Sequence, residues 1–215
     1  MFNAKFWSAA IVSMMVLVVA TVAFADGWEH IDTTDGVWVY EKDAGDDVMF
    51  RGTLRADVGI GELLTVHSDP SHRGHWVFSY ADHETLEQGA NSETYWLKLD
   101  MPFGVTNRDY VLESNYQFNE SNRTVTSVIE SVEHDGKPEQ DCCVRAQTRT
   151  EYTFQAADED TTVIEVVVQT DLKGRVPSRV VNNAQRDWPV ETLTNLVERA
   201  SGSGIEADSR VDGWQ

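Results

Sequence analysis

Hydrophobic and polar residues alternate along much of the chain between residues 26 and 200, and this pattern predicts β-strands. The clearest case is the segment 109–118, where Tyr110, Leu112, Tyr116 and Phe118 share one face and mostly polar residues occupy the other. Successive side chains of a strand point to opposite faces, so such a strand has one buried face and one in water. The same reasoning predicts strands at residues 37–42, 48–56, 78–88, 93–101, 123–132, 148–155 and 162–172.

Three other segments follow a helical pattern. Residues 60–67 and 70–76 are predicted to form two short helices after the second strand, and residues from 177 to about 200 a long final helix. Pro189 lies inside that long helix, where it removes one backbone hydrogen bond and predicts a bend. Residues 28–34 fit either a short helix or an extended segment.

The order of these elements predicts the fold class. Most strands form one run and a long helix follows them, which is typical of an α+β domain. An antiparallel sheet with one buried face needs a covering layer, and the C-terminal helix is long enough to supply it. We therefore expect one α+β domain over residues 26–200, whose last helix either covers a core or closes over a cavity.

Both ends of the chain are predicted to lie outside this domain. Residues 1–25 have the features of a cleaved signal peptide: Lys5, an apolar run at 9–22 that is short for a spanning helix, and an Ala-Phe-Ala ending at Ala25. Cleavage after Ala25 predicts a periplasmic or secreted protein; the alternative is an uncleaved membrane anchor. The Ser-Gly tract that opens residues 201–215 predicts a flexible C-terminal tail.

The charge of the chain narrows the classes of partner. The formal net charge of −19 argues against nucleic-acid binding, which requires a basic surface. It also disfavours broad adsorption to anionic lipid. The two cysteines, Cys142 and Cys143, are adjacent, and the sequence leaves open a vicinal disulfide, pairing with other chains, or two free thiols.

Motifs for catalysis, phosphate binding or metal binding do not occur in the sequence. It contains no Gly-x-Ser-x-Gly, no phosphate-binding loop and no His-Glu-x-x-His. His67, His72 and His75 with Asp69 do not have the spacing of a standard zinc site. We therefore expect no catalytic residues, no metal and no cofactor.

Three blocks of sequence resemble a known family. They are GVWVY at 36–40 with FRG at 50–52, WLKLDMPFGVTNRDYV at 96–111, and DLKG at 171–174 followed by VPSRVVN at 176–182. In this order they resemble the START domain, the steroidogenic-acute-regulatory-protein-related lipid-transfer family of the helix-grip superfamily. The resemblance implies a curved antiparallel sheet gripping the C-terminal helix, with a tunnel between them that holds one lipid. The chain departs from the family in its predicted export, its strong acidity and its single domain, so the resemblance does not specify the cargo. The lack of fusion partners favours a bacterial-type exported member.

The candidate ligand-binding residues come from three places. Aromatic side chains suit a cavity for an amphipathic lipid because Tyr and Trp combine an apolar body with a hydrogen-bonding group. The resemblance implies that the loop at 101–106 lies at the tunnel mouth and that the long helix is a lid. Arg108 and Asp109 are expected to be structural, because adjacent strand residues point to opposite faces. The candidates are Trp76, Tyr95, Trp96, Met101, Phe103, Tyr110, Tyr116, Tyr152, Val180, Asn183, Ala184 and Trp188.

The sequence therefore predicts a monomeric protein that binds one hydrophobic molecule, such as a sterol or phospholipid, and carries or senses it with transient membrane contact. Two alternatives stay open. One is a cyclase-like helix-grip enzyme acting on an apolar substrate, and the other is a protein-interaction module with a vestigial cavity. Turnover of a bound ligand distinguishes the first, and a filled cavity without lipid distinguishes the second.

Overall fold

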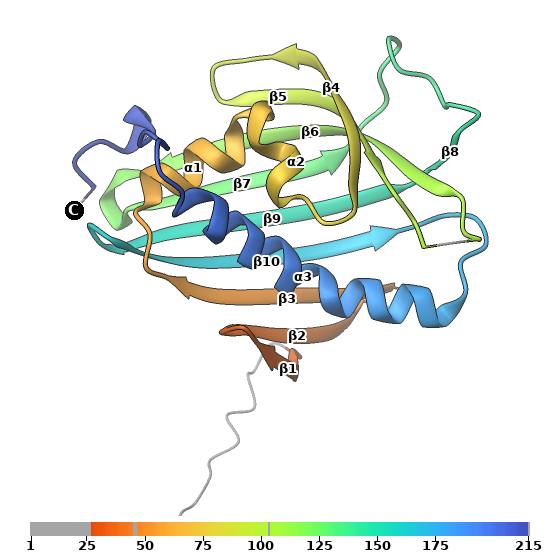
Figure 1. The fold of residues 1–215 in the computed structure, drawn as a ribbon, viewed down its shortest axis with the longest axis horizontal. Helices are drawn as coiled ribbons and strands as arrows, with labels where there is room; N and C mark the ends of the chain where they lie inside the picture. The colour runs from red at the N-terminus through yellow and green to blue at the C-terminus, as the bar shows by residue number, and fades with distance from the viewer. Residues whose placement is uncertain (1–26, 45–46, 103, 215) are drawn as a thin grey trace, which may run out of the picture.

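The computed structural model describes residues 27–44, 47–102 and 104–214, with the backbone alone at residues 47, 178–180 and 182–185 (Figure 1). It contains one ten-stranded sheet in the order β1-β2-β3-β10-β9-β7-β6-β5-β4, with β8 paired to β6. Every neighbouring pair is antiparallel except β6 and β8, which are parallel. The strands are β1 (Glu29–Thr34), β2 (Val37–Ala44), β3 (Asp47–Ala56), β4 (Tyr80–Gln88), β5 (Ser92–Leu99), β6 (Asn107–Asn119), β7 (Thr124–Ser131), β8 (Cys143–Arg145), β9 (Gln147–Asp158) and β10 (Thr161–Asp171).

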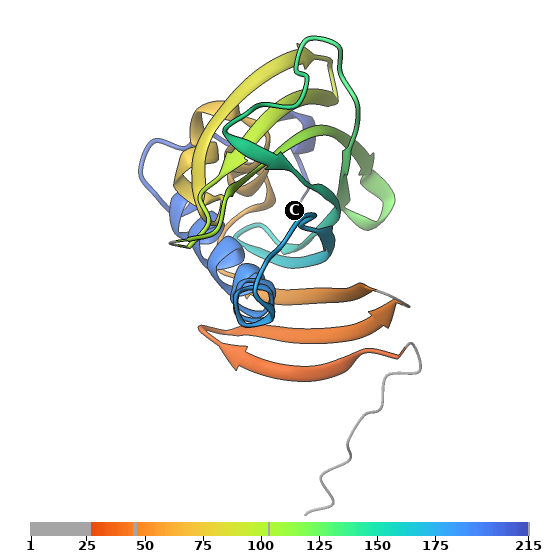
Figure 2. The same cartoon turned by 90° about the vertical axis from the view of Figure 1, so that its right-hand side faces the viewer.

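The α-helices lie on one side of this sheet, which curves around them (Figures 1 and 2). The α-helices are α1 (Ile60–Ser68), α2 (Arg73–Trp76) and α3 (Ser178–Ala200), and the 3-10 turns are η1 (Pro70–His72), η2 (Glu120–Asn122) and η3 (Ser209–Val211). The predicted α+β architecture, with a curved sheet and a long C-terminal helix, is confirmed. None of the helices in the described ranges has both the length and the apolar character needed to cross a bilayer.

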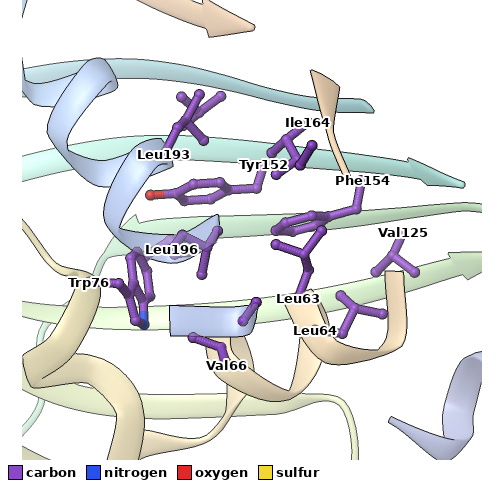
Figure 3. Close-up of a cluster of buried hydrophobic side chains, with 14 of the residues drawn as sticks. Leu63, Leu64, Val66, Trp76, Val125, Tyr152, Phe154, Ile164, Leu193 and Leu196 are labelled. Carbon is purple, nitrogen blue, oxygen red and sulfur yellow. The ribbon is translucent and has the colours of Figure 1, made fainter. Parts of the chain in front are cut away.

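The hydrophobic core lies between the sheet and the helices. Figure 3 shows Tyr152 and Phe154 of β9 facing Leu193 and Leu196 of α3, with Leu63 of α1 beside them. All five side chains are buried, and they belong to one continuous apolar cluster. The alternation predicted from the sequence places these strand residues on the inner face, because every second side chain of β9 points the same way.

Helix α3 rests directly on the sheet at one point. Gly52 of β3 faces Pro189, and a Cβ atom added at Gly52 would lie 2.8 Å from the Cβ atom of Pro189 and 3.2 Å from Leu193 Cδ1. A side chain at this position would therefore push the helix away from the sheet. The helix continues through Pro189 and changes direction part-way along its length (Figure 1). Its second half is anchored by Leu193, Leu196 and Ala200, which are buried.

One segment that the sequence left open is decided by the structure, and two others differ from the prediction. Residues 28–34, which the sequence left open, contain strand β1 rather than a helix. Strand β8 was not predicted, since three residues are too few to show an alternation. The chain after α3 is packed onto the domain, whereas its composition predicted a flexible tail. Val211 is buried, and the Asp208 N–H donates to the Gly61 carbonyl. The rings of Trp214 and Phe118 meet edge to face, with their centroids 6.5 Å apart.

Candidate ligand cavity between the sheet and the last helix

A cavity of about 80 Å³ lies between the inner face of the sheet and helices α2 and α3. Five of the aromatic residues predicted from the sequence line it. Trp76 comes from α2, Tyr95 from β5, Tyr110 from β6, Tyr152 from β9 and Trp188 from α3. The period of a strand explains how residues so far apart in the chain converge, since each strand presents alternate side chains to this space. Aliphatic side chains of β5, β6, β7 and β10 complete the wall.

Three predicted residues lie elsewhere. Trp96 points to the opposite face of β5 from Tyr95, where its indole Nε1 donates to Asp109 Oδ2 at 2.8 Å. Tyr116 is outside the cavity wall, and its hydroxyl forms a 2.8 Å hydrogen bond with His67 Nδ1. Met101 is half-buried in the loop before β6 and is likewise not part of the wall.

The remaining predicted residues cannot be placed in the site. Phe103 lies outside the described residues. Val180, Asn183 and Ala184 belong to the first half of α3, but their side chains lie outside the described part of the structure. Their predicted contribution to the inner face of the lid stays a prediction.

Four threonines that the sequence did not single out also line the cavity. Thr148 and Thr150 lie on β9, Thr170 on β10 and Thr192 on α3. Thr148 Oγ1 is 2.8 Å from Thr170 Oγ1 and donates to the Gln169 carbonyl at 3.1 Å. In sequence the three strand threonines look ordinary and Thr192 is one of several polar residues of a helix, so only the parity of Thr148 and Thr150 with Tyr152 marks any of them. They give an otherwise apolar wall several uncharged polar groups.

The lining carries no charged side chain among the residues that the structure describes. Its tyrosines stay neutral because burial disfavours the phenolate. Burial raises the pKa of Tyr95 to about 12, and it also raises the pKa values of Tyr110 and Tyr152. The cavity is therefore uncharged at every pH near neutrality.

A buried ion pair fixes α2 against the sheet. Arg73 of α2 donates two hydrogen bonds to the carboxylate of Glu93 on β5, at 3.3 and 2.6 Å, and Thr85 Oγ1 donates to the same carboxylate at 2.8 Å. The Arg73 guanidinium also lies 3.9 Å from the centroid of the Tyr95 ring. These contacts position Trp76, which follows Arg73 by three residues on the same short helix.

His67 of α1 lies in an aromatic cluster behind the cavity. Its ring stacks on the Trp76 ring with a centroid distance of 5.1 Å. It lies edge to face with Tyr152 and Phe154, at centroid distances of 4.6 and 5.2 Å. Burial, with a smaller effect of the nearby Arg73 charge, lowers the pKa of His67 to about 3. A neutral imidazole at this place completes the packing of the core.

The histidines near His67 are not arranged around a common point. His72 Nδ1 accepts hydrogen bonds from the Arg199 guanidinium at 3.0 and 3.2 Å, which ties η1 to the end of α3. Within residues 27–44, 47–102 and 104–214, no group of three or more His, Cys, Asp or Glu side chains is placed to hold a metal ion.

Arg108 and Asp109 hold the loops at one end of the cavity. Arg108 donates to the carbonyls of Thr106, Leu172 and Lys173, joining the turn before β6 to the turn after β10. Asp109 points to the other face and accepts from Arg145 on β8 at 2.8 Å. The two residues thus have the structural role and the opposite directions that the sequence predicts, although they do not pair with each other.

The adjacent cysteines form a disulfide with each other. Cys143 begins β8 and pairs with Asn107 at the start of β6. Among the three states that the sequence left open, the structure has the vicinal disulfide.

Sequence comparison decides the family of this fold. Residues 62–200 match the START domain. The chain belongs to the START domain family. It is also 27% identical to an uncharacterized protein of Pseudomonas aeruginosa in an alignment 192 residues long, which covers 86% of this chain and 93% of that protein.

Solved structures share the START fold. The STAR-related lipid transfer protein (fragment 25–204) of Xanthomonas axonopodis superposes with a TM-score of 0.71 at 24% identity, covering 82% of this chain and all of that one. Human STARD10 gives a TM-score of 0.73 at 21% identity, covering 81% of this chain and 73% of that one. Human StAR-related lipid transfer protein 5 gives 0.74 at 18% identity, covering 82% and 87%.

Proposed function

We propose that this START domain protein binds a single hydrophobic molecule, a lipid, between its sheet and helix α3, and that it carries or senses that molecule. The observation that carries the proposal is the uncharged, largely aromatic and aliphatic lining of the cavity under α3. Two structural relatives support it by their names: the STAR-related lipid transfer protein of Xanthomonas axonopodis and human StAR-related lipid transfer protein 5.

The size of the cavity implies that the ligand-loaded protein is more open. Ligand pockets usually measure about 300–1,000 Å³, whereas this cavity measures about 80 Å³. The second half of α3 is held by buried Leu193, Leu196 and Ala200. The half before Pro189 contains none of these three side chains, and its Arg186 forms a partly exposed ion pair with Asp32 of β1. We propose that this half moves when the ligand enters. Burial of about 400 Å² of apolar ligand surface contributes on the order of 10 kcal/mol to offset the cost of opening.

We further propose that the protein acts outside the cytoplasm as a monomer and meets membranes transiently. The support is the signal-peptide pattern of residues 1–25, with cleavage after Ala25. An exported protein that shields a lipid from water fits transfer or sensing between membranes. Extraction of the bound ligand from the purified protein, followed by mass spectrometry, would identify the lipid.

A substitution that fills the cavity tests the proposed site. Val168 of β10 faces the cavity, and its neighbour Val167 faces the other side of the same strand. We expect Val168→Trp to weaken binding of Nile red, an uncharged apolar fluorophore, by more than about tenfold, since the larger ring occupies the ligand's space. Fluorescence titration measures the affinity, and circular dichroism checks that the fold is kept.

Val167→Trp is the matched control. It adds the same ring on the outer face and is expected to leave Nile red binding within about twofold of wild type. Equal effects of the two substitutions, or binding by folded Val168→Trp as tight as wild type, would place the ligand outside this cavity.

A further inference from the structure

Two polar atoms in the lining of the cavity have no hydrogen-bond partner among the residues that the structure describes. They are the indole Nε1 of Trp76 on α2 and the hydroxyl Oγ1 of Thr192 on α3. Both side chains are buried, Thr192 completely. Another threonine of the same helix behaves differently, since Thr194 Oγ1 donates to the Val190 carbonyl at 2.7 Å. Buried polar groups almost always have partners, so the two orphaned atoms need an explanation.

The chemistry of the two atoms defines what satisfies both. An indole N–H donates and never accepts, whereas a hydroxyl both donates and accepts. An oxygen atom with free lone pairs therefore has the chemistry that both groups need, since it accepts from the indole N–H and also pairs with the hydroxyl. A group that can only donate, such as an ammonium, leaves the Trp76 donor unpaired.

The surroundings exclude a charged oxygen. No charged side chain lines the cavity within the described residues. Arg73 and Glu93, the buried charges beside the lining residue Tyr95, bind each other. A carboxylate or phosphate placed between Trp76 and Thr192 would be buried with two neutral donors and no cation, which is far less favourable than hydration. A hydroxyl or carbonyl oxygen meets no such penalty.

We propose that the cavity binds the oxygen-bearing, uncharged end of its ligand between Trp76 Nε1 and Thr192 Oγ1, with the apolar remainder against the aliphatic wall. The ligand is then a long-chain or ring lipid whose enclosed polar group is an alcohol or a carbonyl. This inference rests on the proposed function and specifies the ligand class for the same site. The atoms come from two different helices, so the ligand oxygen also links α2 to α3.

Matched probes test the inference in the full-length protein. Hexadecanol, hexadecane and palmitate share one chain length and differ in the terminal group. Each is allowed to partition between the protein and phosphatidylcholine vesicles at pH 8, and the protein-bound amount is measured by mass spectrometry. Thr192→Val removes a hydroxyl and keeps the shape of the side chain, whereas Trp76→Phe removes the indole N–H and also shortens the ring system. We expect each to lower hexadecanol affinity by about five- to tenfold relative to hexadecane affinity, which corrects for any change in the apolar wall.

The stability of the unliganded protein gives a second readout. If the Thr192 hydroxyl is hydrogen-bonded only when the ligand is bound, Thr192→Val removes an unsatisfied buried group from the unliganded protein. The thermal midpoint then stays the same or rises by about 2–4 °C. If the hydroxyl has a structural role through a bound water, the same substitution lowers the midpoint. Such a fall would contradict the proposal.

Two further substitutions are controls. Trp96→Phe removes an indole that is bonded to Asp109 on the other face of the sheet, and Thr194→Val removes a hydroxyl outside the cavity wall. Neither is expected to alter hexadecanol affinity, and Trp96→Phe is expected to lower the thermal midpoint because it leaves a buried carboxylate short of a donor.

The outcomes separate this inference from the proposed function. Equal losses for hexadecanol and hexadecane in both variants, or no loss for either, overturn the oxygen site while lipid binding stands. Palmitate affinity that falls about five- to tenfold in the variants overturns the uncharged class. Wild-type protein that takes up none of the three probes overturns the proposed function and with it the inference.

Discussion

Arg73→Met is expected to lower the free energy of unfolding by about 3–5 kcal/mol, because it leaves the Glu93 carboxylate buried without its partner. Both side chains are about one-twentieth exposed, and Arg73 Nη2 lies 2.6 Å from Glu93 Oε2. The guanidinium also packs on the Tyr95 ring, so the substitution removes an aromatic contact as well. Urea denaturation at pH 7 measures the change.

An exposed ion pair of the same sheet is the control. Arg149 pairs with Glu130, and the two side chains are about half exposed. Arg149→Met is expected to cost about 0–1 kcal/mol, since solvent screens such pairs. The double substitution Arg73→Met with Glu93→Leu should recover part of the loss, because it removes the stranded charge. A cost for Arg73→Met no larger than that of Arg149→Met would show that the buried pair does not hold α2 in place.

The wild-type protein is expected to lose about 2 kcal/mol of stability through His67 alone as the pH falls from 7 to 5. Burial lowers the pKa of His67 to about 3 from its ordinary value of 6.5. Below pH 6.5 the unfolded chain binds a proton at this residue and the folded chain does not. The neutral imidazole's contribution is therefore fully present above pH 6.5 and decreases as the pH falls towards 3.

His67→Phe tests this origin. The substitution keeps an aromatic ring but has no titrating group, so its stability should be about 2 kcal/mol less dependent on pH over the same interval. Tyr116→Phe is the control: it removes the hydrogen bond to His67 Nδ1 but keeps the buried imidazole and the pH dependence. The measurement is the urea midpoint at pH 7 and pH 5. A pH dependence of His67→Phe equal to that of wild type would contradict a buried neutral His67.

The fold could be predicted well because the alternation of apolar and polar residues in a long strand indicates which of its faces is buried. In β6 and β10 apolar residues occupy every second position through most of the strand. This alternation predicts both the strand and the face that points into the core. Short or composite features gave no such signal. Strand β8 has three residues, and the tail is held by Val211 and Trp214, whose docking sites at α1 and β6 are far away in sequence.

Some of the site residues could be predicted from the alternation within a strand, and others could not. Strand parity separates Tyr95 from Trp96, and a stricter use of it would have removed Trp96 from the candidates. The threonines of β9 and β10 resemble ordinary strand residues, so their place in the wall depends on tertiary structure. The unpaired atoms of Trp76 and Thr192 became visible only when α2 and α3 were seen to share one cavity.

Native mass spectrometry of the full-length protein, purified from its host without added lipid, tests the central claim of a lipid-binding cavity most directly. We predict one additional uncharged hydrophobic molecule per chain, which is released on denaturation, recovered in organic extract and absent from Val168→Trp. The contradictory result is the mass of the bare polypeptide in both proteins, with no molecule taken up after incubation with phosphatidylcholine vesicles that contain hexadecanol.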